Sequence, residues 1–320
     1  MRSEDSAKFL DSLRADDLGG LISIPKSDLH NHAGRGGNLR TLSAWWGVEI
    51  TPPNAPLGSL NAMNDWFQKN VKVHRPGHPG YLSRLKAAFF QAERDGVRLL
   101  ALSFDPSEVD ALGGPDGFGE ETERMRAAFA PHVDFLPELS FDRSCDPGWA
   151  YERAEEILPR GIFFSIDLAC DERARPARQF RRLYELAGSL NVLRIAHVGE
   201  LGSAADVVDA CESLSLDEVH HGIAAASSTS ALNFLRESGI RLNVCPASNI
   251  MIGRAASYRA HPIRTLFEAG VAVTVNTDDQ LIFGASASEE YLNLYRAGTL
   301  DAEALDLIRL TGLARKGDSE

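Results

Sequence analysis

The sequence lacks the features of membrane, nucleic-acid-binding and disulfide-stabilised proteins. Its 320 residues contain no apolar run long enough to span a bilayer, and residues 1–8 have no apolar signal core. The four cysteines are far apart and form no Cys-x-x-Cys pair, which argues against zinc-ribbon and thioredoxin-like sites and favours reduced thiols. A formal net charge of −12 argues against a nucleic acid as partner, because phosphate binding needs a basic face. We therefore expect a cytoplasmic protein that binds a small molecule and neither membrane nor nucleic acid.

The composition is typical of one globular α/β domain. The chain is 44% hydrophobic and 24% charged, and its 27 glycines are spread along its length. A chain of this size buries most of its surface on folding and is ordinary for one α/β barrel. We therefore predict a single domain over residues 1–320, and the sequence leaves open whether it forms a homo-oligomer.

Short apolar runs that end in polar residues alternate along the chain with amphipathic segments. Eight such units predict an α/β fold of the (β/α)8 TIM-barrel type, since no nucleotide-binding glycine spacing follows the first strand. The predicted strands are 27–32, 97–105, 133–141, 162–169, 192–198, 218–221, 240–245 and 271–276. The predicted helices between them include 81–94, 150–158, 177–187, 204–214, 230–237 and 263–269.

Two segments fall outside the eightfold pattern. Residues 1–24 predict a short amphipathic helix that covers the bottom of the barrel. Residues 38–80 form a long insertion after the first strand, and this insertion is rich in tryptophan. Its aromatic side chains either pack in the core or form a lid over the barrel mouth, where insertions shape substrate pockets.

Imidazole and carboxylate groups collect at the carboxyl ends of the predicted strands, where the active sites of such barrels form. His30 and His32 are two residues apart at the end of the first strand and share one face of it. The other groups lie at the ends of three later strands. His197 and Glu200 are at the end of strand five, His220 and His221 at the end of strand six, and Asp278 and Asp279 at the end of strand eight.

Three imidazoles and one carboxylate make a ligand set that suits one Zn²⁺ ion, with Fe²⁺ or Mn²⁺ as alternatives. No cysteine joins the set, which favours a hydrolytic site over a structural one. An open position on such an ion would hold a water whose pKa falls to about 7.

The ordered combination of these motifs resembles the adenosine deaminase family of the metal-dependent amidohydrolase superfamily. The resemblance covers about residues 25–313. The stretches that carry it are Leu29-His30-Asn31-His32, Asp167-Leu168-Ala169-Cys170-Asp171-Glu172, His197-Val198-Gly199-Glu200, His221-Gly222, Cys245-Pro246-Ala247-Ser248-Asn249, His261-Pro262 and Asn276-Thr277-Asp278-Asp279.

The resemblance implies a role for each matching residue. Glu200 would protonate the ring nitrogen beside the attacked carbon, since a buried carboxyl group can have its pKa raised enough to supply a proton. His221 would deprotonate or orient the attacking water, and Asp279 would hydrogen-bond a ring nitrogen. The zinc ligands would be His30, His32, His197 and Asp278.

The sequence departs from the family pattern at positions that bear on the substrate. Adenosine deaminases usually carry an acid shortly after the first histidine pair, where it contacts ribose, but here the stretch 33–37 contains none. Arg35 in this stretch suggests a substrate with an anionic substituent. Cys170 stands where the family has a glycine whose amide faces the purine, so its thiol would reshape the pocket. His220 replaces a glycine and Gln280 a proline.

The sequence therefore predicts a zinc-dependent deaminase that releases ammonia from an adenosine- or adenine-like purine or a related aminated heterocycle. The first alternative is a metal-dependent amidohydrolase that cleaves a cyclic amide or ester, although a ring-protonating acid at Glu200 favours deamination. The second alternative is a non-catalytic barrel that serves only for binding, although degenerate barrels of that kind usually lose a ligand or the acid.

Overall fold

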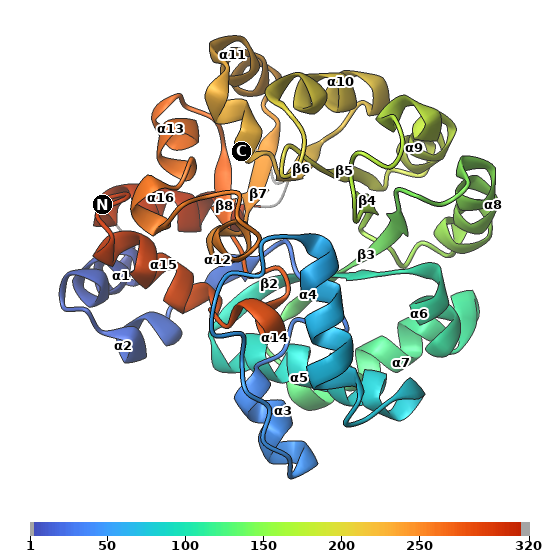
Figure 1. Cartoon of the computed structure of the whole chain (residues 1–320), viewed down its shortest axis with the longest axis horizontal. Coiled ribbons are helices and arrows are strands. Elements are labelled where there is room, and N and C mark those ends of the chain that lie inside the picture. The colour runs from blue at the N-terminus through green and yellow to red at the C-terminus, as the bar shows by residue number, and fades with distance from the viewer. Residues whose placement is uncertain (1–2, 315–320) are drawn as a thin grey trace.

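The computed structural model describes residues 3–314 and contains eight parallel strands in the order β1 to β8 around a barrel (Figure 1). Each strand pairs with the next in the chain, so every crossover runs over the outside of the sheet through at least one helix. The strands are β1 Lys26–Asp28, β2 Val97–Phe104, β3 Asp134–Asp142, β4 Ser165–Ala169, β5 Leu193–Val198, β6 Glu218–His221, β7 Arg241–Val244 and β8 Val273–Val275.

Helices surround the barrel and cover its mouth. The α-helices are α1 Glu4–Arg14, α2 Leu18–Ile22, α3 Leu39–Trp46, α4 Leu60–Phe67, α5 Gly77–Arg94, α6 Pro106–Ala111, α7 Gly114–Phe129, α8 Pro147–Ile157, α9 Arg181–Ser189, α10 Ala204–Leu214, α11 Thr229–Ser238, α12 Pro246–Met251, α13 Ile263–Glu268, α14 Gln280–Phe283, α15 Ala287–Arg296 and α16 Ala302–Leu313. Shorter turns are the π-helix η1 Gln68–Lys72 and the 3₁₀ turns η2 Leu158–Arg160, η3 Ala177–Phe180, η4 Ile223–Ser227 and η5 Tyr258–Ala260. None of the helices within residues 3–314 combines the length and the apolar character needed to cross a membrane.

The predicted TIM barrel is confirmed, and the largest error concerns its first strand. The prediction extended that strand over 27–32, whereas the regular ladder of β1 ends at Asp28. Beyond that point, the Leu29 amide donates a hydrogen bond to the side-chain oxygen of Asn276. Only isolated bridges continue the strand pairing. One of these bridges, Asn31 with Asp278, links the segment after β1 to the segment after β8.

The N-terminal segment packs against the outer helix layer. Phe9 and Leu13 on α1 are fully buried. The Phe9 ring lies edge-on to Tyr291 of α15 and under the guanidinium of Arg309 on α16. Because α16 itself covers the outside of β1 and β8, this segment extends the helical ring there.

The insertion after the first strand forms α3, α4 and η1, and α4 lies across the front of the strands in Figure 1. Its aromatic side chains differ in how deeply they are buried. Phe67 is buried in a second apolar cluster against α14, Trp46 and Trp66 are half-buried, and Trp45 is exposed. The core interpretation is therefore wrong for Trp45.

Candidate active site

A cavity of about 860 Å³ opens at the carboxyl ends of the strands. Its floor consists of residues that end strands, among them Ser103, Ala169 and His197. Its other side is formed by the insertion, including Asn64 and Phe67 of α4. The position agrees with the general placement of active sites in α/β barrels.

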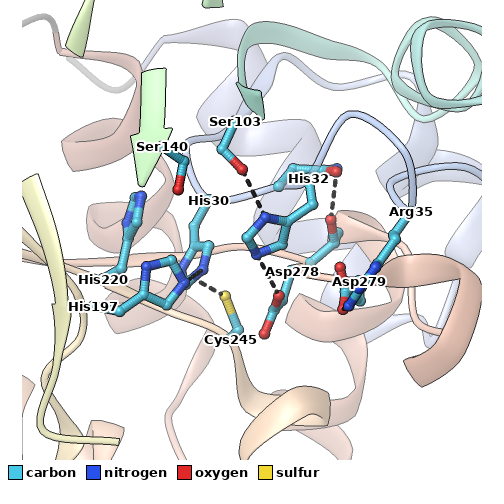
Figure 2. A network of polar contacts seen from close by, with 12 residues as sticks. His30, His32, Arg35, Ser103, Ser140, His197, His220, Cys245, Asp278 and Asp279 are labelled. Carbon is cyan, nitrogen blue, oxygen red and sulfur yellow. Dashed lines mark hydrogen bonds and ion pairs between the residues drawn. The ribbon is translucent and has the colours of Figure 1, made fainter. Parts of the chain in front are cut away.

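The four predicted metal ligands lie together (Figure 2): His32, His197 and Asp278 line the cavity, and His30 is buried next to them. The ligand atoms of His30, His32 and Asp278 are all within 4.8 Å of one another. Nε2 of His32 is 3.1 Å from Oδ1 of Asp278. His197 joins the group through its Nε2 atom, which lies 3.0 Å from Nε2 of His30.

The hydrogen bonds around two of these histidines test whether a cation fits between them. Nδ1 of His30 is 3.1 Å from the carbonyl oxygen of Asn243, which can only accept, so this nitrogen carries the proton. Nδ1 of His197 is 3.0 Å from both carboxylate oxygens of Asp167, so it also carries its proton there. The two Nε2 atoms therefore face each other with lone pairs, and burial, together with the neighbouring His197, lowers the pKa of His30 to about 3. A metal ion is the cation that this arrangement fits.

Backbone geometry at the site is unusual for residues with a side chain. His221 and Asp278 have φ angles of 65° and 56°, in the left-handed region that residues other than glycine seldom adopt. Such strained positions cluster at functional sites because the surrounding structure holds them. Here the Asp278 amide donates to the His30 carbonyl, which fixes the carboxylate beside the histidines.

Glu200 lies on the loop after β5 and points into the cavity. The Glu172 carboxylate anchors this loop by accepting hydrogen bonds from the backbone amides of Gly199, Leu201 and Gly202. Burial, with a further contribution from Asp278, raises the pKa of Glu200 well above its ordinary value. The loop therefore presents a carboxyl group that tends to hold its proton.

The side chains of the two adjacent histidines of β6 point in different directions, one into the cavity and one into the barrel interior. Nε2 of His221 lies 3.4 Å from Oε1 of Glu200 and 3.8 Å from Oδ2 of Asp278, inside the cavity. His220 is buried in the barrel interior, where Nε2 is 3.0 Å from Oε1 of Glu138 and the ring stacks on that of His30 at 3.9 Å. His220 thus packs against the predicted ligand His30 and does not line the cavity.

Asp279 lies beside the predicted ligand Asp278 and is paired with Arg35. Nη1 of Arg35 donates to Oδ2 of Asp279 at 2.8 Å, and Nη2 donates to Asn64 at 2.9 Å. Oδ1 of Asp279 is buried and has no hydrogen-bond partner among the described residues. It is thus a free acceptor on the cavity wall, whereas the guanidinium proposed for an anionic substituent is already occupied.

Cys170 stands at the carboxyl end of β4 and lines the same cavity. Desolvation and the neighbouring Asp142 raise the pKa of its thiol to about 12. The group therefore remains a neutral thiol, which shapes the pocket and is a poor nucleophile.

Comparison with known proteins assigns the family. The model of the family described as Adenosine deaminase matches residues 150–315, about half of the chain. A protein of Treponema pallidum, named as a candidate adenosine/adenine deaminase, is 30% identical over 293 residues, which cover 90% of this chain and 97% of that protein. The chain belongs to the adenosine deaminase family. As a member, it is a hydrolase that acts on C–N bonds other than peptide bonds.

Solved structures share the fold of this adenosine deaminase family member. The adenine deaminase of Arthrobacter aurescens superposes with a TM-score of 0.77 at 22% identity, covering 92% of this chain and 94% of that one. An amidohydrolase of Burkholderia ambifaria, which contains bound zinc, gives a TM-score of 0.74 at 20% identity, covering 93% and 87%.

The sequence analysis gave no role to two residues that hydrogen-bond the predicted ligands His32 and His197. Ser103 on β2 lies with its hydroxyl 2.6 Å from Nδ1 of His32, and Asp167 on β4 orients His197. Asp167 is a charged residue in the middle of the buried strand β4, and that position was a usable signal. Ser103 carries no such signal, because a serine in a strand is common.

Proposed function

We propose that the protein is a zinc-dependent aminohydrolase that removes the exocyclic amino group of an adenine- or adenosine-like purine and releases ammonia. The observation that carries this proposal is the pair of Nε2 lone pairs of His30 and His197, 3.0 Å apart, beside an acid on the same cavity. A cation site with a proton donor next to it is what hydrolytic deamination requires.

The ligands in this proposal are His30, His32, His197 and Asp278, and the ion is zinc. The donor set of three imidazoles and one carboxylate supports this choice, as does the zinc of the Burkholderia ambifaria amidohydrolase. When bound, the ion supplies a water that is nucleophilic near neutral pH.

The two catalytic groups divide the proton chemistry between them. A ring carbon that bears an amino group is a poor electrophile until the neighbouring ring nitrogen gains a proton. Glu200 gives that proton, and its raised pKa suits a general acid. His221, 3.4 Å from Glu200 and 3.8 Å from Asp278, would deprotonate or orient the attacking water.

Three further residues select the substrate in this proposal. The unpaired Oδ1 atom of Asp279 contacts the ring, and Arg35 holds Asp279 in place. Cys170 narrows the pocket beside the ring. The names of the Treponema pallidum and Arthrobacter aurescens proteins favour adenine or adenosine as the substrate. A cavity of about 860 Å³ accommodates a ring with a substituent.

We further propose that residues 38–80 act as a lid, since Asn64 and Phe67 from this segment line the cavity. The reaction is assigned to the cytoplasm, in keeping with four cysteines that are all free.

A substrate screen tests the proposal. The zinc-loaded protein is incubated with adenine, adenosine, nucleotides, modified purines and pterins, and ammonia release is measured. Turnover of an aminated purine is the expected result. Hydrolysis of cyclic amides or esters without any deamination would instead favour the amidohydrolase alternative, and zinc binding without turnover would favour a binding role.

A further inference from the structure

A buried pair outside the ligand set, Asn249 on α12 and His261 after η5, touches both proposed catalytic groups. Asn249 is fully buried and His261 is nearly so. Nδ2 of Asn249 lies 3.2 Å from Oε1 of Glu200 and 3.1 Å from Nδ1 of His221. Nε2 of His261 lies 3.2 Å from Oδ1 of Asn249. One amide therefore bridges the acid and the histidine, and a second histidine holds that amide.

The proton on His261 can be placed from its neighbours. The backbone N–H of Ile263 lies 3.1 Å from Nδ1 of His261, and since an amide nitrogen only donates, Nδ1 must accept. Burial lowers the pKa of His261 to about 4, so the ring is neutral and its single proton is on Nε2. That N–H must meet an acceptor, which fixes the oxygen of the Asn249 amide toward His261.

The opposite side of the amide is then its NH₂ group, which has two protons to donate. One proton is directed to Oε1 of Glu200 and the other to Nδ1 of His221. Since Nδ1 of His221 accepts, the proton of the neutral ring is on Nε2. This N–H faces the cavity beside Glu200 and Asp278.

We propose that Asn249, oriented by His261, is a positioning residue that keeps His221 in the Nε2–H form and aims Glu200 at the substrate. In this form Nε2 has no lone pair, so His221 orients the attacking water by donating a hydrogen bond to it. The proton that the water loses then goes to the Asp278 carboxylate, whose Oδ2 atom lies 3.8 Å from Nε2 of His221. This inference rests on the proposed function and decides between the two roles that the resemblance left open for His221. Residues that hold functional groups in this manner typically contribute about 10–100-fold to activity.

The first test reads the tautomer without any substrate. Long-range ¹H–¹⁵N spectra of the zinc-loaded, ¹⁵N-histidine-labelled protein report which nitrogen of each ring is protonated, with His221 assigned from its loss in His221→Gln. We expect the His221 proton on Nε2 in the wild type. In Asn249→Asp an oxygen replaces the amide donor, and we expect the His221 proton to move to Nδ1. The control Asn293→Asp makes the same change on α15 and should leave the spectrum unchanged.

The second test is kinetic. His261→Leu should lower kcat by about 10–100-fold with a much smaller change in KM and with normal zinc content, because the freed amide can rotate. His261→Gln, which keeps a donor for Asn249, should recover part of the loss, and it keeps the test available if His261→Leu does not fold. The surface variant His132→Leu should behave as wild type.

The outcomes separate this inference from the proposed function. A wild-type His221 proton on Nδ1, or unchanged spectra in Asn249→Asp with unchanged kcat in both His261 variants, would overturn the positioning role even in an active deaminase. A wild-type protein that deaminates nothing, but shows the expected tautomer and its shift in Asn249→Asp, would contradict the proposed function and leave the hydrogen-bond arrangement standing.

Discussion

The two walls of the cavity are built differently. On the barrel wall, the histidines are fixed by partners at strand ends, as His197 is by Asp167 and His32 by Ser103. On the insertion wall, Asn64 is bonded to Arg35, and Lys72 lies over the Phe67 ring. The difference fits the proposal in which the sheet holds the metal ligands, while the added helical segment acts on substrate selection only through its hold on Arg35.

The largest effect should come from removing a ligand on the barrel wall. His197→Ala should deplete zinc and abolish activity, with a loss greater than the 10²–10⁴-fold that a general acid typically contributes. Metal analysis and ammonia release measure both effects. Wild-type zinc content in this variant would show that the ligand set is wrong.

Glu200→Gln should separate acid chemistry from metal binding on the same wall. The amide keeps the shape of the side chain but cannot protonate the ring, so kcat should fall by about 10²–10⁴-fold while zinc is retained. Glu172→Gln is a useful comparison, because it weakens the loop and leaves the acid in place. Normal turnover by Glu200→Gln would remove Glu200 from the mechanism.

The sequence predicted the barrel well, because short apolar runs that end in polar residues leave a local signal at each strand. It also placed the residues that meet at the cavity floor, since parallel strands bring their carboxyl ends together. It missed the end of β1, because the departure at Leu29 depends on Asn276, which is far away in the chain. It also left the pairing of Arg35 with Asp279 unseen, for the same physical reason.

Changing a residue that hydrogen-bonds a proposed ligand should reduce zinc binding less than removing the ligand itself. Asp167→Asn keeps the size of the side chain but weakens its hold on His197, so zinc affinity should fall by about 10–100-fold. Competition with a chelator measures the affinity. An unchanged affinity would mean that the imidazole is held by its strand alone.

The smallest effect on activity is expected from a substitution on the insertion wall. Asn64→Ala removes the hydrogen bond to Arg35, a loss of about 1 kcal/mol or about fivefold in kcat/KM. Zinc content should stay normal. Asn70→Ala changes a residue of η1 that binds the Trp66 carbonyl and serves as the control. Metal loss in Asn64→Ala would contradict the division of labour between the two walls.

The coordination of the bound ion tests the central claim most directly. X-ray absorption at the zinc edge of the loaded protein should show three imidazole nitrogens at about 2.0–2.1 Å together with carboxylate oxygen, and no sulfur. The same spectrum from His197→Ala protein should have lost one imidazole. A first shell that contains sulfur from Cys245, or a wild-type shell made mainly of water, would contradict a site made by His30, His32, His197 and Asp278.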